Sequence, residues 1–377
     1  MAFRPFFLAA SVWSATALAA WVVMFTTGLS LPSRFAPLTW HIHEMLFGFV
    51  MAAIAGFMLT AIPNWTGRAP INGRPLAALA TLWLAGRLAC LVSALIPLWL
   101  AVAIDLAFPF LLCAVAAREI ISSRNWRNLP MPVPIGILGV ANLLMHLESA
   151  GLAVPAGLGW RLALAAIMVL ISVVAGRIIP LFTRNWLARR DISDLPATRG
   201  TVDRVALFTL HAGMIGWAFF PAFRPVGAVL LFAAALNLWR LVRWRGIATS
   251  AEPLVAILHV GYLWLVIGVA LLGVSMLTGR MPEAAAIHAL TAGAIGTMVH
   301  AVMTRVSLGH SGRALRADRI TVLIYLLVVA AAAVRVVAAI GGSFLPLIQL
   351  SAVLWIGSFF LFAVWYGRIL LTPFVSR

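Results

Sequence analysis

Residues 40–62 read WHIHEMLFGFVMAAIAGFMLTAI, an apolar run that carries two histidines and a glutamate near its start. At a rise of ~1.5 Å per residue, a run of this length crosses the ~30 Å hydrocarbon core of a membrane as one helix. Similar runs follow one another almost end to end, and the 377-residue chain is 63% hydrophobic and 10% charged, with a mean hydropathy of +1.06. Because soluble domains are about 25% charged, the sequence predicts an all-α, polytopic bundle of transmembrane helices.

Other classes of protein do not fit this composition. A transmembrane barrel shows ~10-residue stretches of alternating polarity, and none occurs here. The only two cysteines, Cys90 and Cys113, lie inside apolar runs, so we expect neither a disulfide framework nor a cysteine metal site. A bound metal would then have nitrogen, oxygen or thioether ligands. Soluble enzymes, secreted disulfide scaffolds and disordered chains are excluded as well.

The apolar runs predict about twelve transmembrane helices. They cover residues 6–27, 40–62, 75–97, 98–121, 132–151 and 158–182, and then 204–223, 225–244, 253–277, 283–307, 318–340 and 344–370. A polar connection of mixed charge, residues 183–203, joins two six-helix halves, 1–182 and 204–377. We expect a single transmembrane domain over residues 1–377, without a separate soluble domain. The first run is too long for the apolar part of a signal peptide.

The basic residues indicate how the chain is oriented. All 27 are arginine, the formal net charge is +17, and most lie in short connections between apolar runs. This distribution is typical of topology signals and not of a nucleic-acid-binding surface, so we expect no nucleic-acid partner. About 21 arginines fall on the side of the N-terminus, and four (Arg34, Arg161, Arg224 and Arg280) fall opposite, while Arg87 and Arg335 lie within spans. The positive-inside rule predicts that both termini are cytoplasmic.

Three span ends resemble one another at a period of four spans. The second span ends in AIPNWTGR (61–68), the sixth in IIPLFTRNW (178–186) and the tenth in MTRVSLGHSGR (303–313). A true repeat would predict a pseudo-threefold bundle of four-helix arcs. Proline, glycine and arginine at helix ends near the head groups explain the same similarity without a repeat.

Eight histidines are the most informative residues of so apolar a chain, because ionisable groups inside a membrane are costly and usually face the bundle interior for a functional reason. Their positions along the spans predict two layers. The outer layer contains His41, His43, His146 and His288, and the layer on the cytoplasmic side contains His211, His259 and His300, with His310 in a loop. His288 and His300 share one helix but lie ~18 Å apart along its axis, so they serve different centres.

Imidazoles on facing helices hold haem and metal ions in helical bundles. A bis-histidine haem b needs two rings at one depth, and His288 with either His41 or His43 meets this requirement. Because His41 and His43 are ~200° apart on an ideal helix, only one of them points at a given centre. Copper or a second haem would suit the cytoplasmic-side layer of His211, His259 and His300. Simple hydrogen bonds between helices are the alternative role of any one of these histidines.

Charged residues within the spans also gather toward the outer side, namely Glu44, Asp105, Glu148, Arg161 and Arg335. Such groups bind haem propionates, relay protons or form structural ion pairs. Glu44 follows His41 by three residues and could orient its ring. Tyr262 lies one turn after His259 and could supply a proton to a catalytic centre formed by the cytoplasmic-side histidines.

Several motifs resemble those of one family. They are FRPFF (3–7), HIHEM (41–45), GFMLTAIPNWTGR (56–68), GRIIP (176–180) and HALT (288–291) with the stretch that follows to His310, and they look like the NnrS family over essentially the whole chain. The resemblance implies a polytopic protein of the bacterial inner membrane that carries haem and copper. It also implies an association with denitrification and with tolerance of nitric oxide and nitrosative stress. It assigns no individual histidine as a ligand.

The favoured function is therefore that of a haem- and copper-containing membrane oxidoreductase or scavenger of nitric oxide. In this hypothesis an outer bis-histidine haem accepts electrons from a quinol or a cytochrome, and a second histidine centre keeps an open position for the diatomic ligand. The alternatives are a non-catalytic haem electron carrier or sensor, and a metal or proton transporter.

Overall fold

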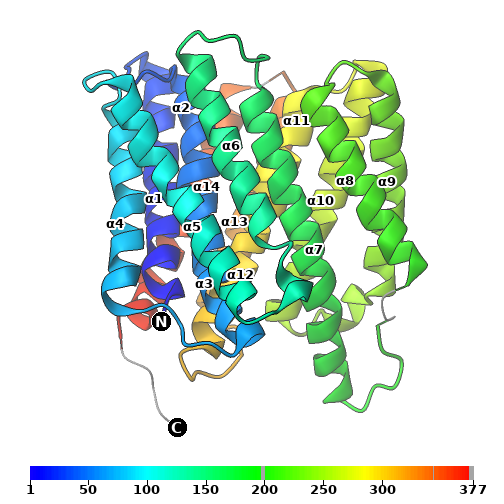
Figure 1. Cartoon of the computed structure of the whole chain (residues 1–377). Helices are drawn as coiled ribbons and strands as arrows, with labels where there is room; N and C mark the ends of the chain where they lie inside the picture. Colours follow the sequence, from blue (N-terminus) through cyan, green and yellow to red (C-terminus); the bar gives the residue numbers. More distant parts are fainter. Residues whose placement is uncertain (197–199, 343, 373–377) are drawn as a thin grey trace. The chain divides into compact units, whose positions relative to one another are not determined.

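The computed structural model describes residues 1–196, 200–342 and 344–372. The described residues are 80% helical and contain no strand. Eleven helices within the described ranges are long and apolar enough to cross a membrane. The predicted all-α polytopic bundle is thus confirmed (Figure 1). A further helix, α8 (Thr201–Phe219), matches the predicted span 204–223 but carries Asp203 and Arg204 in its first turn.

The helices agree with the predicted spans to within a few residues at most ends. The first six spans correspond to α1 (Phe3–Thr27), α2 (Pro37–His43) with η1 (Glu44–Val50) and α3 (Met51–Thr66), α4 (Gly73–Leu91), α5 (Leu98–Ser122), α6 (Pro132–Ser149) and α7 (Leu158–Ala188), with a short turn η2 (Trp126–Asn128) before α6. The later spans correspond to α8, α9 (Arg224–Arg243), α10 (Pro253–Thr278), α11 (Glu283–His288) with η4 (Ala289–Ile295) and α12 (Gly296–Gly309), α13 (Arg319–Ile340) and α14 (Leu345–Leu371), with a short turn η3 (Gly246–Thr249) before α10.

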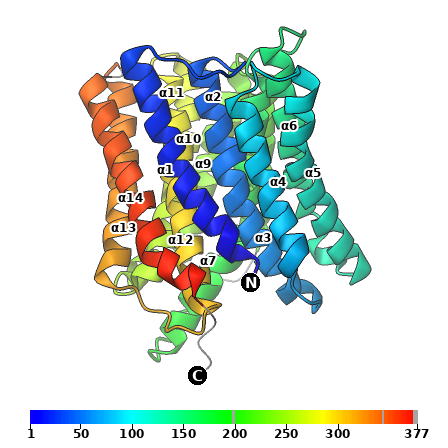
Figure 2. The same cartoon turned by 90° about the vertical axis from the view of Figure 1, so that its left-hand side faces the viewer.

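The chain divides into two compact units. The first contains Met1–Ala166 and the end of α14 from Phe362, and the second begins at Ile167 and ends at Leu361. The division falls within α7 and α14, whereas the polar connection 183–203 predicts a boundary between two halves after α7. Within the first unit, α5 packs between α4 and α6, and α3 contacts both α1 and α5 (Figure 2). Arg4 at the start of α1 donates a hydrogen bond to the carbonyl of Thr372, so the first helix begins where the last one ends.

Two spans that were predicted as continuous helices are interrupted by π-helical segments. The π-helix η1 follows His43 directly, and η4 follows His288 directly, each over seven residues. In each segment the fifth residue after the histidine is a glycine under an indole: a Cβ on Gly48 would lie 2.5 Å from Trp13, and one on Gly293 would lie 2.6 Å from Trp264. Because π-helical turns are rare and concentrate at functional sites, the two histidines before them are marked as functional candidates.

The likeness of the second and tenth spans is therefore stronger in the structure than in the sequence. The sixth span, α7, is an α-helix throughout and lacks a π-helical segment. The pseudo-threefold arrangement stays a prediction.

Helices α4 and α5 approach closely at Gly86. A Cβ at this position would lie 2.9 Å from a carboxylate oxygen of Asp105 and 3.2 Å from its Cα atom. The backbone of α5 cannot move away from such a contact as a flexible side chain can. Gly86 therefore sets the distance at which Asp105 faces α4.

We predict that Gly86→Ala lowers the free energy of unfolding by about 1–3 kcal/mol, because overpacking forces the two helices apart. Gly357→Ala in α14 is the matched control, since its Cβ would meet only a leucine methyl at 4.0 Å. Thermal unfolding of both variants in detergent measures the difference. Equal midpoints would show that α4 and α5 do not depend on this contact.

Candidate metal centre

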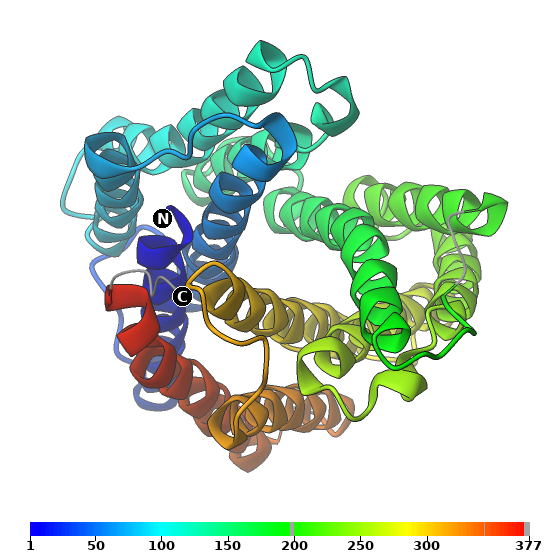
Figure 3. The same cartoon turned by 90° about the horizontal axis from the view of Figure 1, so that it is seen from below.

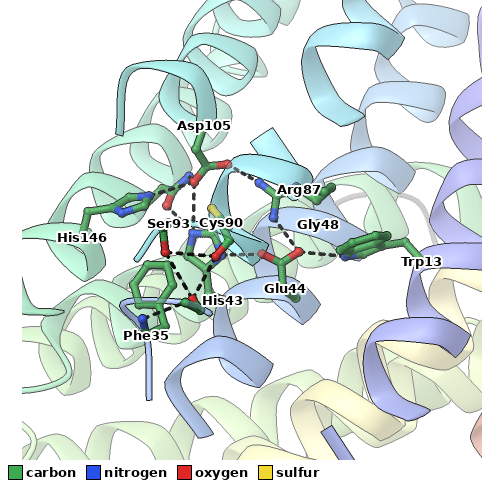
Figure 4. Close-up of polar contacts among 12 residues, drawn as sticks. Trp13, Phe35, His43, Glu44, Gly48, Arg87, Cys90, Ser93, Asp105 and His146 are labelled. Carbon is green, nitrogen blue, oxygen red and sulfur yellow. Dashed lines mark hydrogen bonds and ion pairs between the residues drawn. The ribbon is translucent and has the colours of Figure 1, made fainter. Parts of the chain in front are cut away.

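A polar cluster lies inside the first unit, where the end of α2, the start of η1 and the helices α4, α5 and α6 meet (Figure 4). We call it the buried cluster, and it consists of His43, Glu44, Arg87, Cys90, Asp105, Asn142 and His146. No member is more than 3% exposed. Local helix geometry gathers these side chains, because Arg87 and Cys90 are three residues apart on α4 and Asn142 and His146 are four apart on α6, so each pair shares a face.

Asp105 is the hub of the buried cluster. Its Oδ2 atom accepts hydrogen bonds from Asn142 Nδ2 at 2.8 Å and from His146 Nε2 at 3.0 Å, and lies 3.1 Å from His43 Nε2. Its Oδ1 atom accepts a bond from Arg87 Nη2. Through this one side chain, α5 is linked to α2, α4 and α6.

Glu44 is the second buried carboxylate of the cluster. Its Oε2 atom accepts hydrogen bonds from Arg87 Nη1 at 2.9 Å and from Trp13 Nε1 at 2.8 Å, and its Oε1 atom lies 3.0 Å from His43 Nδ1. The guanidinium of Arg87 therefore bridges the two carboxylates, in the fork geometry that suits arginine. A buried charge is tolerated only with such pairing.

The ring of His43 faces acceptors on both sides. Nε2 lies 2.7 Å from Asn142 Oδ1 and near Asp105, while Nδ1 faces the carboxylate of Glu44. Both nitrogens donate when both carry hydrogen, which makes the ring a cation and balances the charges of Glu44, Asp105 and Arg87. A metal ion could take the place of either proton.

An aromatic side chain from the connection between α1 and α2 closes the buried cluster. The ring of Phe35 stacks on His43 at 4.6 Å and lies 5.0 Å from the ring of His146. The connection is fixed to the end of α4, where the hydroxyl of Ser33 donates to the carbonyl of Cys90 at 2.9 Å and the amide of Arg34 donates to Ser93 at 2.9 Å. Phe35 is 4% exposed and excludes water from this side.

Four members of the buried cluster offer metal ligands. Ligand atoms of His43, Cys90, Asp105 and His146 all lie within 4.8 Å of one another. A tetrahedral ion with bonds of ~2.0–2.3 Å would draw them to about 3.5 Å. Two imidazoles, a thiol and a carboxylate suit copper or zinc and do not suit magnesium or calcium, which prefer oxygen alone.

The buried cluster contains residues that the sequence predicts for a site and others that it does not predict. His43, His146, Glu44 and Asp105 were predicted for the outer layer. Only two cysteines, both inside apolar runs, predict no cysteine metal site, yet the thiol of Cys90 lies within 4.8 Å of the ligand atoms of Asp105 and the two histidines. Nothing in the sequence connects Cys90 to residues on other helices except its three-residue spacing from the intramembrane Arg87.

His41 and His43 diverge, as their ~200° separation predicted. His43 enters the buried cluster, whereas the ring of His41 stacks on Trp21 of α1 at 4.4 Å. The carboxylate of Glu44 bonds to His43, and its predicted orienting role toward His41 stays a prediction. Arg87 and Trp13 donate to the other oxygen of the same carboxylate and hold it beside His43.

In the second unit, His288 bonds to a backbone carbonyl of its own helix. Its Nδ1–H donates to the carbonyl of Ala284 at 2.7 Å, which leaves Nε2 as the lone-pair nitrogen. Nη1 of Arg335 is buried and has no hydrogen-bond partner among the described residues. His288 could hold a haem through Nε2 and Arg335 could bind its propionate through Nη1, and the pairing of His288 with His41 or His43 stays a prediction.

The histidines of the predicted cytoplasmic-side layer each contact a hydroxyl. His211 lies 2.9 Å from Ser172, His259 2.9 Å from Thr183 and His300 2.9 Å from Ser358. Ser172 and Thr183 are eleven residues apart on α7, which is ~16 Å along its axis. The structure therefore does not bring His211 and His259 to one ion, and any centre at this level uses them separately.

Tyr262 belongs to another buried network. Its hydroxyl donates to Asn237 Oδ1 at 2.6 Å and accepts from Arg240 Nη1 at 2.8 Å, and Arg240 in turn binds Asp203. These bonds fix the hydroxyl between α9 and α10. Its predicted role as a proton donor to His259 stays a prediction.

We predict that Arg87→Gln destabilises the protein by about 3–5 kcal/mol, because it leaves two carboxylates buried without their shared cation. The double variant Arg87→Gln/Glu44→Gln should regain part of this loss, since it removes one of the two charges. Thermal unfolding of the single and double variants forms a mutant cycle. Strictly additive losses would contradict the coupling of Arg87 and Glu44.

Comparison with known proteins agrees with the motifs and with the fold. The sequence model of the NnrS protein family matches residues 1–373, essentially the whole chain. No curated protein sequence matches it. The family suggests metal binding, which the donor atoms of the buried cluster support. The resemblance seen in the sequence is confirmed, and the chain belongs to the NnrS family as a multi-pass membrane protein related to nitric oxide.

Proposed function

We propose that this protein binds nitric oxide and reduces or detoxifies it at metal centres between its transmembrane helices, as a haem- and copper-containing oxidoreductase. The observation that carries this proposal is the buried cluster, where two imidazoles, a thiol and a carboxylate lie within reach of one ion. Stability alone does not explain why these polar groups are buried, because hydrophobic replacements of buried ion pairs are often neutral or stabilising. Metal binding in a nitric-oxide-related family does explain it.

Copper fits the buried cluster in charge as well as in donor type. A monovalent copper ion in place of the proton on His43 leaves the total charge unchanged. A divalent ion in place of the protons of His43 and of the Cys90 thiol does so too. Because changing the net charge inside a membrane is costly, such an exchange favours metal loading. His43, Cys90, Asp105 and His146 would hold the ion.

Haem b fits the surroundings of His288. The imidazole would hold the haem through Nε2, with its tautomer fixed by the carbonyl of Ala284, and Arg335 would pair with a propionate. When bound, a haem supplies one-electron chemistry and a position for a diatomic ligand. We propose a quinol or a cytochrome as the electron donor.

The chain's own residues then have defined tasks. Asn142 and Glu44 orient the ring of His43 from its two sides, and Arg87 holds Glu44 in place. Phe35 excludes water from the centre, which strengthens each of these electrostatic contacts. The three hydroxyl-bound histidines, His211, His259 and His300, with Tyr262, stay candidates for proton transfer to the bound gas.

The membrane of residence follows from the same proposal. The arginine distribution and the bond between Arg4 and Thr372 support a topology in which both termini are on the cytoplasmic side of a bacterial inner membrane.

A second function has a specific observation in its favour. Both nitrogens of His43 have partners and Phe35 stacks on the ring, so a metal held there would be enclosed by side chains. A closed centre suits a non-catalytic electron carrier or a sensor. Nitric oxide would then meet only the haem.

We predict that His43→Ala and His288→Ala each remove a different centre. Purified wild-type protein should contain copper and protoheme and should consume nitric oxide at an electrode when a reductant is present. His43→Ala should lose copper and keep the haem spectrum, and His288→Ala should do the reverse. Metal analysis and reduced-minus-oxidised spectra give the readout.

His310→Ala, at the end of α12, is the control that should keep both centres. If the metal-loaded wild type neither binds nor consumes nitric oxide, the oxidoreductase proposal is wrong. Protein without haem or copper would leave metal or proton transport as the leading function.

A further inference from the structure

A groove of about 730 Å³ opens at one end of the first unit. It lies where α3 ends, the connection of residues 67–72 runs on, α4 begins and α5 ends, at the end that carries the N-terminus (Figure 3). Much of the lining is apolar and includes Ile71, Leu79, Leu111 and Val115. Its volume is within the ~300–1,000 Å³ range of sites for small molecules. The buried cluster contributes no residue to it.

The polar end of the groove carries a net positive charge. Glu119, whose side chain is 8% exposed, accepts hydrogen bonds from Arg68 Nε at 2.5 Å and from Arg118 Nη2 at 2.7 Å. One carboxylate is thus paired with two guanidinium groups, and the net charge of the three side chains is one positive charge. Arg68 and Arg118 are 46% and 66% exposed, so their remaining N–H groups are accessible to a ligand.

The start of α4 adds to the positive electrostatic potential at this end of the groove. Asn72, which lines the groove, precedes the helix but makes no side-chain cap, and the first turn contains no acidic residue. The positive end of the helix dipole is therefore uncompensated within the groove. It supplements the two arginines, which are the main ligands for an anion.

We infer that this groove binds one anionic phospholipid, with the phosphate at Arg68 and Arg118 and an acyl chain along Leu79 and Leu111. Apolar walls beside exposed arginines at a helix end match the two halves of such a molecule, and basic pockets between transmembrane helices are suited to anionic head groups. Leu111 is 44% exposed, which gives an acyl chain an apolar entrance from the bilayer. This inference does not depend on the proposed function.

Native mass spectrometry of the delipidated full-length protein in neutral detergent tests the inference. Phosphatidylglycerol and phosphatidylcholine of identical acyl chains are the probes. We expect one phosphatidylglycerol to bind about tenfold more tightly than phosphatidylcholine. Inorganic phosphate at millimolar concentration should not compete, because it lacks the apolar half.

Three variants distinguish the contribution of the arginine charges to lipid binding from that of the space in the groove. Arg68→Gln/Arg118→Gln should abolish the preference for phosphatidylglycerol, and Ala78→Trp should block binding while the arginines remain. Glu119→Gln should strengthen binding severalfold, since it raises the local charge from one to two. Misfolding cannot mimic that gain. Arg189→Gln/Arg190→Gln, at two exposed arginines beyond α7, is the matched control and should bind as the wild type does.

Equal binding of the two lipids, or an unchanged preference in Arg68→Gln/Arg118→Gln, would overturn the inference. Competition by inorganic phosphate would reassign the site to a free anion. Displacement of the lipid by a short-chain quinone, with no effect of the arginine variants, would reassign the groove to a quinol.

Discussion

The charges of Glu44 and Asp105 are buried in the first unit, and one guanidinium, that of Arg87, bonds both of them. Removed from water, two like charges this close would drive the helices apart without a shared cation. The arginine binds them into one network, and the network fixes His43, His146 and Cys90 around Asp105. The close passage of α4 and α5 at Gly86, the indole of Trp13 over η1 and the anchored Phe35 all follow from accommodating this network.

The π-helical segments show how the histidines are presented. Each follows a histidine and contains a glycine under a tryptophan, once in each unit. Yet the environments differ, since His43 is bonded at both nitrogens while His288 is bonded at one, to a backbone carbonyl. The same local construction therefore presents two kinds of histidine, one inside a charged network and one bonded to a backbone carbonyl. This difference is the physical basis for assigning copper to the first and haem to the second.

The sequence predicts the helices and the family, but it predicts only some residues of the candidate site. The apolar runs predicted the helices because a membrane demands ~20 apolar residues per crossing, and the motifs of residues 3–7, 41–45 and 56–68 predicted the family. The π-helical segments were missed, since an extra residue in a turn leaves hydropathy unchanged. Cys90 and Asn142 were missed because their roles depend on α4 and α6 facing Asp105. His211 and His259 were grouped by depth alone, and only their partners on α7 revealed the ~16 Å between their contacts.

The central claim is that the buried cluster holds a metal through His43, Cys90, Asp105 and His146. X-ray absorption spectroscopy at the copper edge of the purified protein tests it most directly. The account predicts one sulfur scatterer at ~2.3 Å beside nitrogen and oxygen scatterers at ~2.0 Å, with the sulfur lost in Cys90→Ser and unchanged in Cys113→Ser. A copper site without sulfur, or one that Cys90→Ser leaves unaltered, would contradict it.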